Sequence, residues 1–247
     1  MATGFGIDVG GSGIKGAYVD LDTGDFIGDR LRIKTPAHST PQAVAEVCRK
    51  IIEEKGVPED MPLGLTIPAP VKNDLVPFIA NLDQGWAGID VRVLLRKYTG
   101  HMVKCVNDAD AAGYAEVRYG AARDVPGLVI VTTLGTGIGT ALIYNGILVP
   151  NSELGHIEID GKDAESRASS GVKSAKKLSF KQWSKRLQKY YSQLEMLFSP
   201  DLFVVGGGVS RQHEKFLPLL DLKTPIIPAQ LRNQAGIAGA AALAAGV

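Results

Sequence analysis

Short apolar runs recur along the chain, and longer stretches with helical spacing of apolar positions lie between them. Residues 41–55 predict a helix, with Thr40 as its N-cap and Pro41 at its first position. A second helix is expected at residues 109–119, directly after a strand. Because strands alternate with helices, the sequence predicts an α/β fold with a largely parallel sheet. The expected strands are residues 5–9, 14–21, 63–67, 102–106, 128–133 and 202–205.

One internal repeat indicates how these elements are grouped. The Gly-Ser-Gly-Ile sequence of residues 11–14 recurs as Gly-Thr-Gly-Ile at 135–138, and Ala17 recurs as Ala141 at the same offset. In both copies a strand precedes the turn and a β-rich run follows it. The repeat favours a duplication, with two α/β lobes that each open with a glycine-rich hairpin and face each other across a central cleft.

We expect the smaller, N-terminal lobe at residues 1–108 and the larger, C-terminal lobe at 109–235. The Ala/Gly-rich stretch at 235–247 is too short to span a bilayer, which takes about 20 residues. It predicts a helix that packs closely through small residues. From about residue 236 to residue 247, this helix can pack back on the N-terminal lobe.

Composition narrows the classes of protein. The 27 Lys and Arg residues balance 26 Asp and Glu residues, which argues against a globally basic nucleic-acid binder. Two cysteines, Cys48 and Cys105, cannot form a disulfide framework or a cysteine-rich metal site. The N-terminus lacks the pattern of a signal peptide. We expect a cytoplasmic protein without nucleic-acid or membrane partners, and the sequence leaves monomer or homodimer open.

The first glycine motif could bind a dinucleotide or a phosphate group. Residues 11–16 fit the G-x-G-x-x-G pattern, but a dinucleotide site needs a helix after the turn, and here a strand is predicted. A glycine-rich turn between two strands can instead direct backbone N–H groups at an anion, because glycine tolerates positive φ. A plain hairpin turn is the alternative. Two related turns, with Asp8 ahead of the first, favour phosphate, and Asp8 would hold Mg²⁺ through water.

Two further groups of polar residues could act on a substrate. Asn107 and Asp108 lie between a strand and a helix, where they could cap the helix, or bind one hydroxyl group and accept the proton of another. Glu153 and His156 lie three residues apart beside a glycine, which suits binding of sugar hydroxyls. Too few other ligands lie nearby in the sequence to favour zinc.

Four motifs resemble those of the ROK family of sugar kinases, which has the two-lobed actin-like ATPase (ribonuclease H-like) fold. They cover nearly the whole chain: residues 8–15 and 134–139 resemble the two phosphate motifs, 205–210 the motif at the donor's nucleoside end, and 107–108 with 153–156 the sugar site.

The resemblance implies roles for individual residues. Asp108 would be the catalytic base for the sugar 6-hydroxyl, and Mg²⁺ would assist the transfer. The sugar ligands would be Asn81, Asn107, Asp108, Glu153 and His156. The donor phosphates would contact Asp8, Gly10, Gly11, Ser12, Gly13, Lys15, Thr133, Gly135, Thr136 and Gly137, and the nucleoside end Gly206, Gly207 and Gly208.

One departure from the family pattern narrows the resemblance. Family members often carry a zinc-binding cysteine segment after the Gly-His pair, and this chain lacks it. We therefore expect no zinc. Residues 165–169 look like the end of that segment, which makes Glu165 a sugar ligand, with Glu158 as its competitor. A short ROK chain without this segment resembles the actinobacterial polyphosphate glucokinases of the polyphosphate/ATP-glucomannokinase type. The patterns at residues 134–141 and 179–186 also resemble those of that group.

A segregated basic segment (residues 166–194) supports a polyanionic donor. It contains eight Lys or Arg residues and no Asp or Glu. Ser179 and Gln182 form a capping-box pattern, so a helix is expected to start there. A solvated helix face is the alternative, but a polyphosphate chain would neutralise a surface of one sign. The expected polyphosphate path comprises Lys173, Lys177, Lys181, Lys185, Arg186 and Lys189.

The sequence thus predicts a kinase that makes glucose 6-phosphate from glucose with polyphosphate and ATP as donors. Mannose as a second sugar stays open. The alternatives are an ATP-only ROK glucokinase or mannokinase, and a sugar-responsive ROK regulator, which would need a helix-turn-helix ahead of Asp8.

Overall fold

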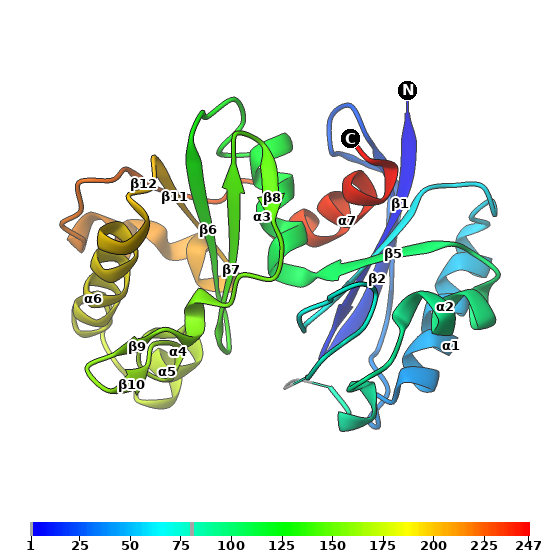
Figure 1. Ribbon diagram of the computed structural model, residues 1–247, viewed down its shortest axis with the longest axis horizontal. Coiled ribbons are helices and arrows are strands. Elements are labelled where there is room, and N and C mark those ends of the chain that lie inside the picture. Colours follow the sequence, from blue (N-terminus) through cyan, green and yellow to red (C-terminus); the bar gives the residue numbers. More distant parts are fainter. Residues whose placement is uncertain (1, 80–81) are drawn as a thin grey trace. The chain divides into compact units, whose positions relative to one another are not determined.

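The chain forms two α/β units, each built on its own five-stranded sheet (Figure 1). The computed structural model describes residues 2–79 and 82–247. Unit 1 comprises Met1–Ala115 and Asn233–Val247, and unit 2 comprises Glu116–Arg232. The division falls inside a helix, a little after the expected boundary at residue 108.

The sheet of unit 1 has the strand order β3-β2-β1-β4-β5. Strands β1, β2 and β3 form an antiparallel meander, whereas β4 and β5 run parallel to β1. Helices α1 and α2 cover one face of this sheet and α7 the other (Figure 1). The elements are β1 (Thr3–Gly10), β2 (Gly13–Asp20), β3 (Phe26–Ile33), α1 (Pro41–Lys55), β4 (Leu63–Ile67), η1 (Gln84–Trp86), α2 (Val91–Thr99), β5 (Val103–Asn107), α3 (Asp108–Arg118), which continues into unit 2, and α7 (Ala235–Ala245).

The two faces of β1 carry different side chains, because successive residues of a strand point to opposite sides. Phe5, Ile7 and Val9 belong to the core shared with α1. The alternating positions Gly6 and Asp8 face α7, where a Cβ atom on Gly6 would stand 2.1 Å from the Ile237 carbonyl oxygen. This alternation places a carboxylate at the α7 face of the sheet.

Helix α7 approaches the sheet so closely that three glycines are needed. A Cβ atom on Gly64 of β4 would lie 1.9 Å from the carbonyl oxygen of Ala240. On the other side of the helix, a Cβ atom on Gly239 would lie 1.8 Å from the carbonyl oxygen of Ala111 in α3. The expected close packing of the Ala/Gly-rich C-terminal stretch is therefore confirmed.

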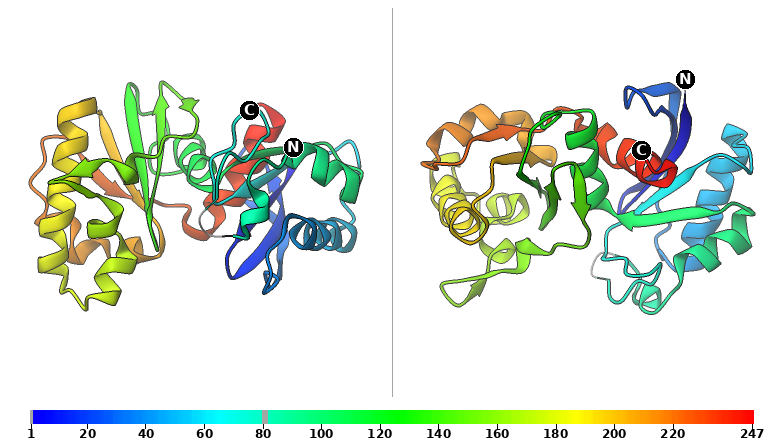
Figure 2. Two further views of the ribbon diagram at one scale, coloured as in Figure 1. Left: turned by 60° about the horizontal axis from the view of Figure 1, so that its bottom comes forward. Right: turned by 45° about the horizontal axis from the view of Figure 1, so that its top comes forward.

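The sheet of unit 2 has the order β12-β11-β6-β7-β8. Its core lies between the sheet and α6 (Figure 2), where Trp183, Tyr190 and Phe203 are fully buried. A smaller apolar cluster with Val129 and Val131 covers the opposite face. The elements are β6 (Leu128–Leu134), β7 (Ile138–Tyr144), β8 (Ile147–Val149), η2 (Leu154–His156), β9 (Glu158–Ile159), β10 (Lys162–Asp163), α4 (Glu165–Ala168), α5 (Ser170–Ala175), α6 (Phe180–Phe198), β11 (Leu202–Gly206), η3 (Gly208–Lys215), η4 (Leu217–Leu219), β12 (Ile226–Pro228) and η5 (Arg232–Gln234), the last of which crosses into unit 1.

The two sheets have the same topology, which supports the predicted duplication. In unit 2 the antiparallel meander is β6, β7 and β8, and β11 and β12 continue the sheet parallel to β6. The glycine repeat thus marks the first hairpin of each sheet. The expectation of a largely parallel sheet was wrong, because three of the five strands of each sheet form an antiparallel meander. The sequence analysis missed the edge strands that complete these meanders.

Caps and close contacts fix the ends of the helices. The Thr40 side chain accepts a hydrogen bond from the Ala43 backbone N–H, with Pro41 in the first turn, as the sequence predicts. The capping box of Ser179 and Gln182 is present at the start of α6.

Among the described residues, no helix combines the length and the apolar character needed to cross a bilayer.

A buried carboxylate stabilises the place where the chain enters unit 2. Glu116 is 1% exposed and accepts hydrogen bonds from three backbone N–H groups. These come from Ala121 at 2.9 Å, Gln230 at 3.0 Å and Leu231 at 2.7 Å. The carboxylate therefore joins the first segment of unit 2 to its last.

Candidate functional site

The first hairpin places a carboxylate and a cation side by side. Asp8 on β1 and Lys15 on β2 are register partners, and Nζ of Lys15 lies 2.8 Å from Oδ2 of Asp8. Oδ1 of Asp8 accepts a hydrogen bond of 3.0 Å from the hydroxyl of Thr66 on β4. The hairpin thus holds the carboxylate in one orientation, and Thr66 is a member of this group that the sequence analysis missed.

A second cation reaches the turn of the first hairpin. Arg32 on β3 is the register partner of Lys15, and its guanidinium donates a 2.9 Å hydrogen bond to the carbonyl oxygen of Ser12. The same guanidinium lies so close to Gly13 that a Cβ atom there would be 2.6 Å from it. Nothing in the sequence pointed to Arg32, because β3 was not predicted and the pairing of β2 with β3 brings it there.

The glycines of the two turns are not explained by positive φ. Among the glycines at 10, 11, 13, 135 and 137, none has left-handed φ, so that part of the sequence argument was wrong. Some are required by close approach instead. A Cβ atom on Gly137 would stand 2.3 Å from Oε2 of Glu165, whereas positions 11 and 135 have open space around them. The open positions leave the tips of both turns accessible to a ligand.

The second hairpin is where several candidate residues meet within unit 2. The carboxylate of Glu165, at the start of α4, accepts a 2.9 Å hydrogen bond from the backbone N–H of Ile138. Gly155 packs on the same residue, since a Cβ atom there would lie 2.1 Å from the Ile138 carbonyl oxygen. Ile138 therefore connects the turn of the hairpin with two segments that carry expected sugar ligands.

The glycine motif after β11 lies beside this hairpin as well. Gly207 has φ 82° and its Cα lies against the backbone of Leu134, where a Cβ atom would be 2.4 Å from the carbonyl oxygen. Gly206 is the register partner of Thr133 in β6. The residues expected at the donor's nucleoside end thus adjoin those expected at its phosphates.

Asn107 and Asp108 occupy the junction of β5 and α3 in unit 1. The side chain of Asn107 is buried and its Oδ1 accepts hydrogen bonds from the backbone N–H groups of Ala109, at 2.8 Å, and Asp110, at 3.1 Å. Asn107 therefore caps the helix, which was the structural alternative. Asp108 is exposed at the helix N-terminus, where its Oδ1 accepts a 2.8 Å hydrogen bond from the Ala109 backbone N–H. An exposed carboxylate so placed can accept a proton from a substrate.

Three expected sugar ligands gather around η2 in unit 2. Glu153 and His156 flank this short helix, and Glu165 lies near enough to influence the ionisation of both. Nδ1 of His156 lies 2.8 Å from Oδ2 of Asp163. Asp163 was missed, because its partner lies across the β9–β10 hairpin and the sequence shows no spacing rule for that.

The pKa values of this group follow from its contacts. The hydrogen bond to the Asp163 carboxylate raises the pKa of His156, with smaller contributions from Glu165 and Glu153. Partial burial opposes ionisation of Asp163, yet hydrogen bonds from His156 and the Ser166 backbone hold its pKa below its usual value. Burial raises the pKa of Glu153, and His156 counteracts this.

Replacing Asp163 by asparagine is expected to lower the pKa of His156, because the imidazolium ion loses its carboxylate partner. An NMR titration of the imidazole C–H resonances measures this, with His156→Gln to assign the signal among the four histidines. An unchanged pKa of His156 in the variant would show that Asp163 does not control its protonation.

A family comparison identifies the chain. The model described as ROK family matches residues 4–174. The chain belongs to the ROK family.

Other proteins resemble this ROK chain over almost its whole length. The polyphosphate glucokinase of Mycobacterium tuberculosis is 49% identical over 239 residues, which cover 96% of this chain and 89% of the relative. The crystal structure of the inorganic polyphosphate/ATP-glucomannokinase from an Arthrobacter strain matches with a TM-score of 0.92 and 48% identity, covering 99% of both chains. A ROK family glucokinase from Streptomyces griseus, crystallised with glucose and AMPPNP, shares the fold at a TM-score of 0.83 and 23% identity over the full length of both. The predicted family and actin-like fold are confirmed.

Of the expected sugar ligands, Asn81 lies outside the described residues. Glu158 was the competitor of Glu165, but Glu158 is exposed on β9, whereas Glu165 bonds to the second hairpin. The geometry favours Glu165.

The cysteine segment typical of many ROK proteins is absent, but the structure brings other possible ligands together. One ligand-type atom from each of His156, Asp163 and Glu165 lies within 4.8 Å of the others. All three side chains already form hydrogen bonds, since Asp163 contacts His156 and Glu165 accepts from Ile138.

The absence of zinc therefore stays a prediction for this ROK chain. Elemental analysis of the purified protein after dialysis is expected to find less than one zinc ion per ten chains. A stoichiometric zinc content that survives dialysis would contradict it.

In the basic segment of the ROK chain, Lys173 and Lys177 precede the helix that starts after Ser179, as expected. Lys173 lies on α5 and its Nζ stands 4.2 Å from the centre of the Phe180 ring. Lys181 and Lys185 follow on α6, four residues apart and hence on one face. Lys189, farther along α6, forms an ion pair with Asp160. The segment is thus partly neutralised by an acid that lies outside it in the sequence.

Proposed function

We propose that the protein transfers the terminal phosphoryl group of inorganic polyphosphate, and also of ATP, to the 6-hydroxyl group of glucose. The observation that carries this proposal is the identity of about half of all residues, over nearly the whole chain, to enzymes named for polyphosphate and glucose or for both donors. The duplicated glycine hairpins support it, because each offers an open turn for phosphate groups.

In the proposed reaction, Asp108 accepts the proton of the attacking hydroxyl group. Its exposure and its place at the α3 N-terminus support this role. Asn107, whose Oδ1 is committed to capping, can still donate from its amide nitrogen to a neighbouring sugar hydroxyl. Glu153, His156 and Glu165 would bind the remaining hydroxyls.

The donor phosphates would be held by the turns of the two hairpins, with Lys15 and Arg32 as cations at the first. Cations and N–H groups aimed at the transferred group stabilise the charge that spreads over its oxygens, which is the main source of catalysis in phosphoryl transfer. Gly206, Gly207 and Gly208 would accommodate the nucleoside end of ATP, which polyphosphate lacks.

Asp8 would hold Mg²⁺ through water. Each of its oxygens has one protein partner, and a carboxylate offers about four acceptor sites, so bridging waters fit. Mg²⁺ usually keeps several waters and takes few carboxylates, which suits a single Asp. When bound, the ion would neutralise charge on the donor. Asp8 and Lys15 would then orient the donor from the adjacent strands β1 and β2.

A nucleotide-free assay tests the proposal. Purified protein with glucose, polyphosphate and a magnesium salt is expected to form glucose 6-phosphate, and ATP in place of polyphosphate is expected to give the same product. If product forms with ATP but not with polyphosphate, the protein is an ATP-only ROK glucokinase. If no product forms with either donor, the proposed kinase activity is wrong. Mannose in place of glucose tests the second sugar.

We also propose that the protein works in the cytoplasm. Its two cysteines are free and buried, and burial raises the pKa of the Cys48 thiol to about 12. Unpaired thiols are usual in reducing compartments.

A further inference from the structure

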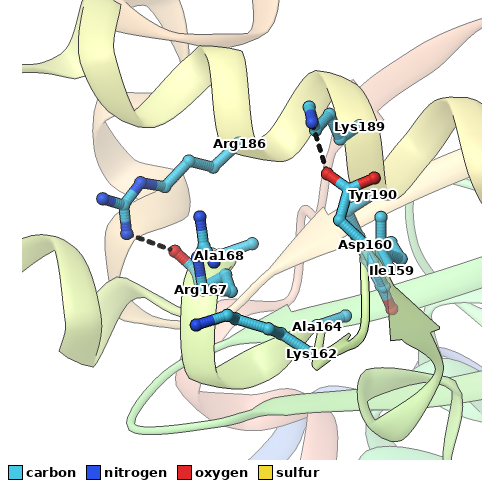
Figure 3. Close-up of a pocket in the computed structure, with 9 residues that line it drawn as sticks. All are labelled: Ile159, Asp160, Lys162, Ala164, Arg167, Ala168, Arg186, Lys189 and Tyr190. Atoms are coloured by element: carbon cyan, nitrogen blue, oxygen red, sulfur yellow. Dashed lines mark hydrogen bonds and ion pairs between the residues drawn. The ribbon is translucent and has the colours of Figure 1, made fainter.

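A small pocket on unit 2 has positive side chains around an apolar floor (Figure 3). About 360 Å³ of space, part of it open solvent, lies among its lining residues. Its uncharged lining consists of Ala168 of α4, Ala164 directly before this helix, Ile159 and Tyr190. The charged residues that line it are Asp160, Lys162, Arg167, Arg186 and Lys189.

The pocket carries an excess of positive charge. Four of the nine lining side chains are cationic and one is anionic. Lys189 is paired with Asp160, and Arg186 donates a 3.0 Å hydrogen bond to the carbonyl oxygen of Arg167 (Figure 3). That bond uses one of the five N–H donors of a guanidinium, so most donors around the pocket can still bind an anion.

Tyr190 lines the pocket and is fully buried. Its hydroxyl group has almost no accessible surface, so an anion in the solvent-open pocket would contact the cationic side chains around it and not this hydroxyl.

The pocket is one helix away from the second phosphate hairpin. Ala164, Arg167 and Ala168 are spaced i, i+3 and i+4, so they share the pocket side of α4. Glu165, about 100° further round, points to the hairpin, where it accepts from the Ile138 N–H. Helix α4 therefore separates a cationic pocket from a turn that is expected to hold donor phosphates.

We propose that this pocket binds a distal phosphate group of the polyphosphate chain whose end occupies the second hairpin. This rests on the proposed function. A chain held at two places gains affinity, because the second contact is intramolecular. A helix with its side chains is about 10–12 Å across, so a chain that occupies both the hairpin and the pocket must span at least that distance. Long chains are therefore expected to benefit more than tripolyphosphate or ATP.

Neutral variants of Lys162 and Arg167 test the pocket, because neither residue belongs to the expected donor or sugar sites. The double variant Lys162→Gln, Arg167→Gln is expected to raise the KM for long-chain polyphosphate at least tenfold. Its KM values for tripolyphosphate and ATP are expected to change less than twofold. The matched control Lys176→Gln removes one charge from the basic segment outside the pocket and is expected to behave as the wild type does.

Removing the acid should have the opposite effect. Asp160→Asn releases Lys189 from its ion pair and keeps a residue that tolerates the φ of 53° at this position. It is expected to tighten long-chain polyphosphate binding severalfold. A gain of affinity cannot arise from misfolding.

Binding measured by calorimetry separates this inference from the proposed function. The slope of log K against log salt for long-chain polyphosphate should fall by about 0.7–0.9 for each cation removed, by analogy with nucleic acids. Unchanged slopes, or equal effects of Lys176→Gln and the double variant, would overturn the pocket even if wild-type protein uses polyphosphate. Wild-type protein that forms no product would reject the proposed function, and the binding slopes would still decide the pocket.

Discussion

Replacing Asp108 by asparagine is expected to lower turnover about 10²- to 10⁴-fold with either donor, the range typical of a lost general base. Asparagine has nearly the same shape, and its side-chain oxygen can still accept the 2.8 Å hydrogen bond that Asp108 receives from the Ala109 backbone N–H. The amide cannot accept the proton of the attacking hydroxyl group. Glucose affinity, measured by calorimetry, should change little, so the loss should appear in kcat.

The control for this variant is the same chemical change at an unrelated site. Asp124 is 91% exposed, so Asp124→Asn should leave kcat unaltered. Near-normal turnover in Asp108→Asn would remove Asp108 from the mechanism. An equal loss in both variants would indicate a general effect of charge.

Replacing Gly64 by alanine is expected to cost about 3 kcal/mol or more of the free energy of unfolding, or to prevent folding. The added Cβ atom would lie 1.9 Å from the carbonyl oxygen of Ala240 and 2.3 Å from its carbon. Both are backbone atoms of α7, so no side chain can turn away, and the helix must move off the sheet. Urea unfolding followed by circular dichroism measures the loss.

Gly208→Ala is the matched control for stability. A Cβ atom on Gly208 would meet nothing within 4 Å, and its φ is not left-handed. Its free energy of unfolding should stay within about 0.5 kcal/mol of the wild-type value. If Gly64→Ala were equally stable, the close packing of α7 on β4 would be wrong.

The sequence was most informative where a local rule is strong. The Thr40 cap, the capping box at Ser179 and the strand after each glycine turn depend only on neighbouring residues, and the structure confirms them. The sheet directions were wrong, because alternation of strands and helices does not reveal a meander. Strand β3 is exposed along most of its length and lacks the apolar run that would mark it.

The partners of the site residues were less accessible to sequence reasoning. Arg32 reaches the first turn through strand pairing, Thr66 reaches Asp8 across the sheet, and Asp163 reaches His156 across a hairpin. Each contact depends on register, which a sequence pattern does not specify. The sequence identified the residues that belong to family motifs, but it did not identify the residues that orient them.

The place of α7 in the chain has a consequence for synthesis on the ribosome. Unit 1 is discontinuous, so all of unit 2 is made before α7 can cover β1 and β4. Until then the nascent sheet exposes a strip of backbone at Gly6 and Gly64, where bare strands are prone to aggregate. Unit 2 is continuous and can fold as soon as it emerges. The first strands synthesised are therefore expected to be the last to reach their native environment.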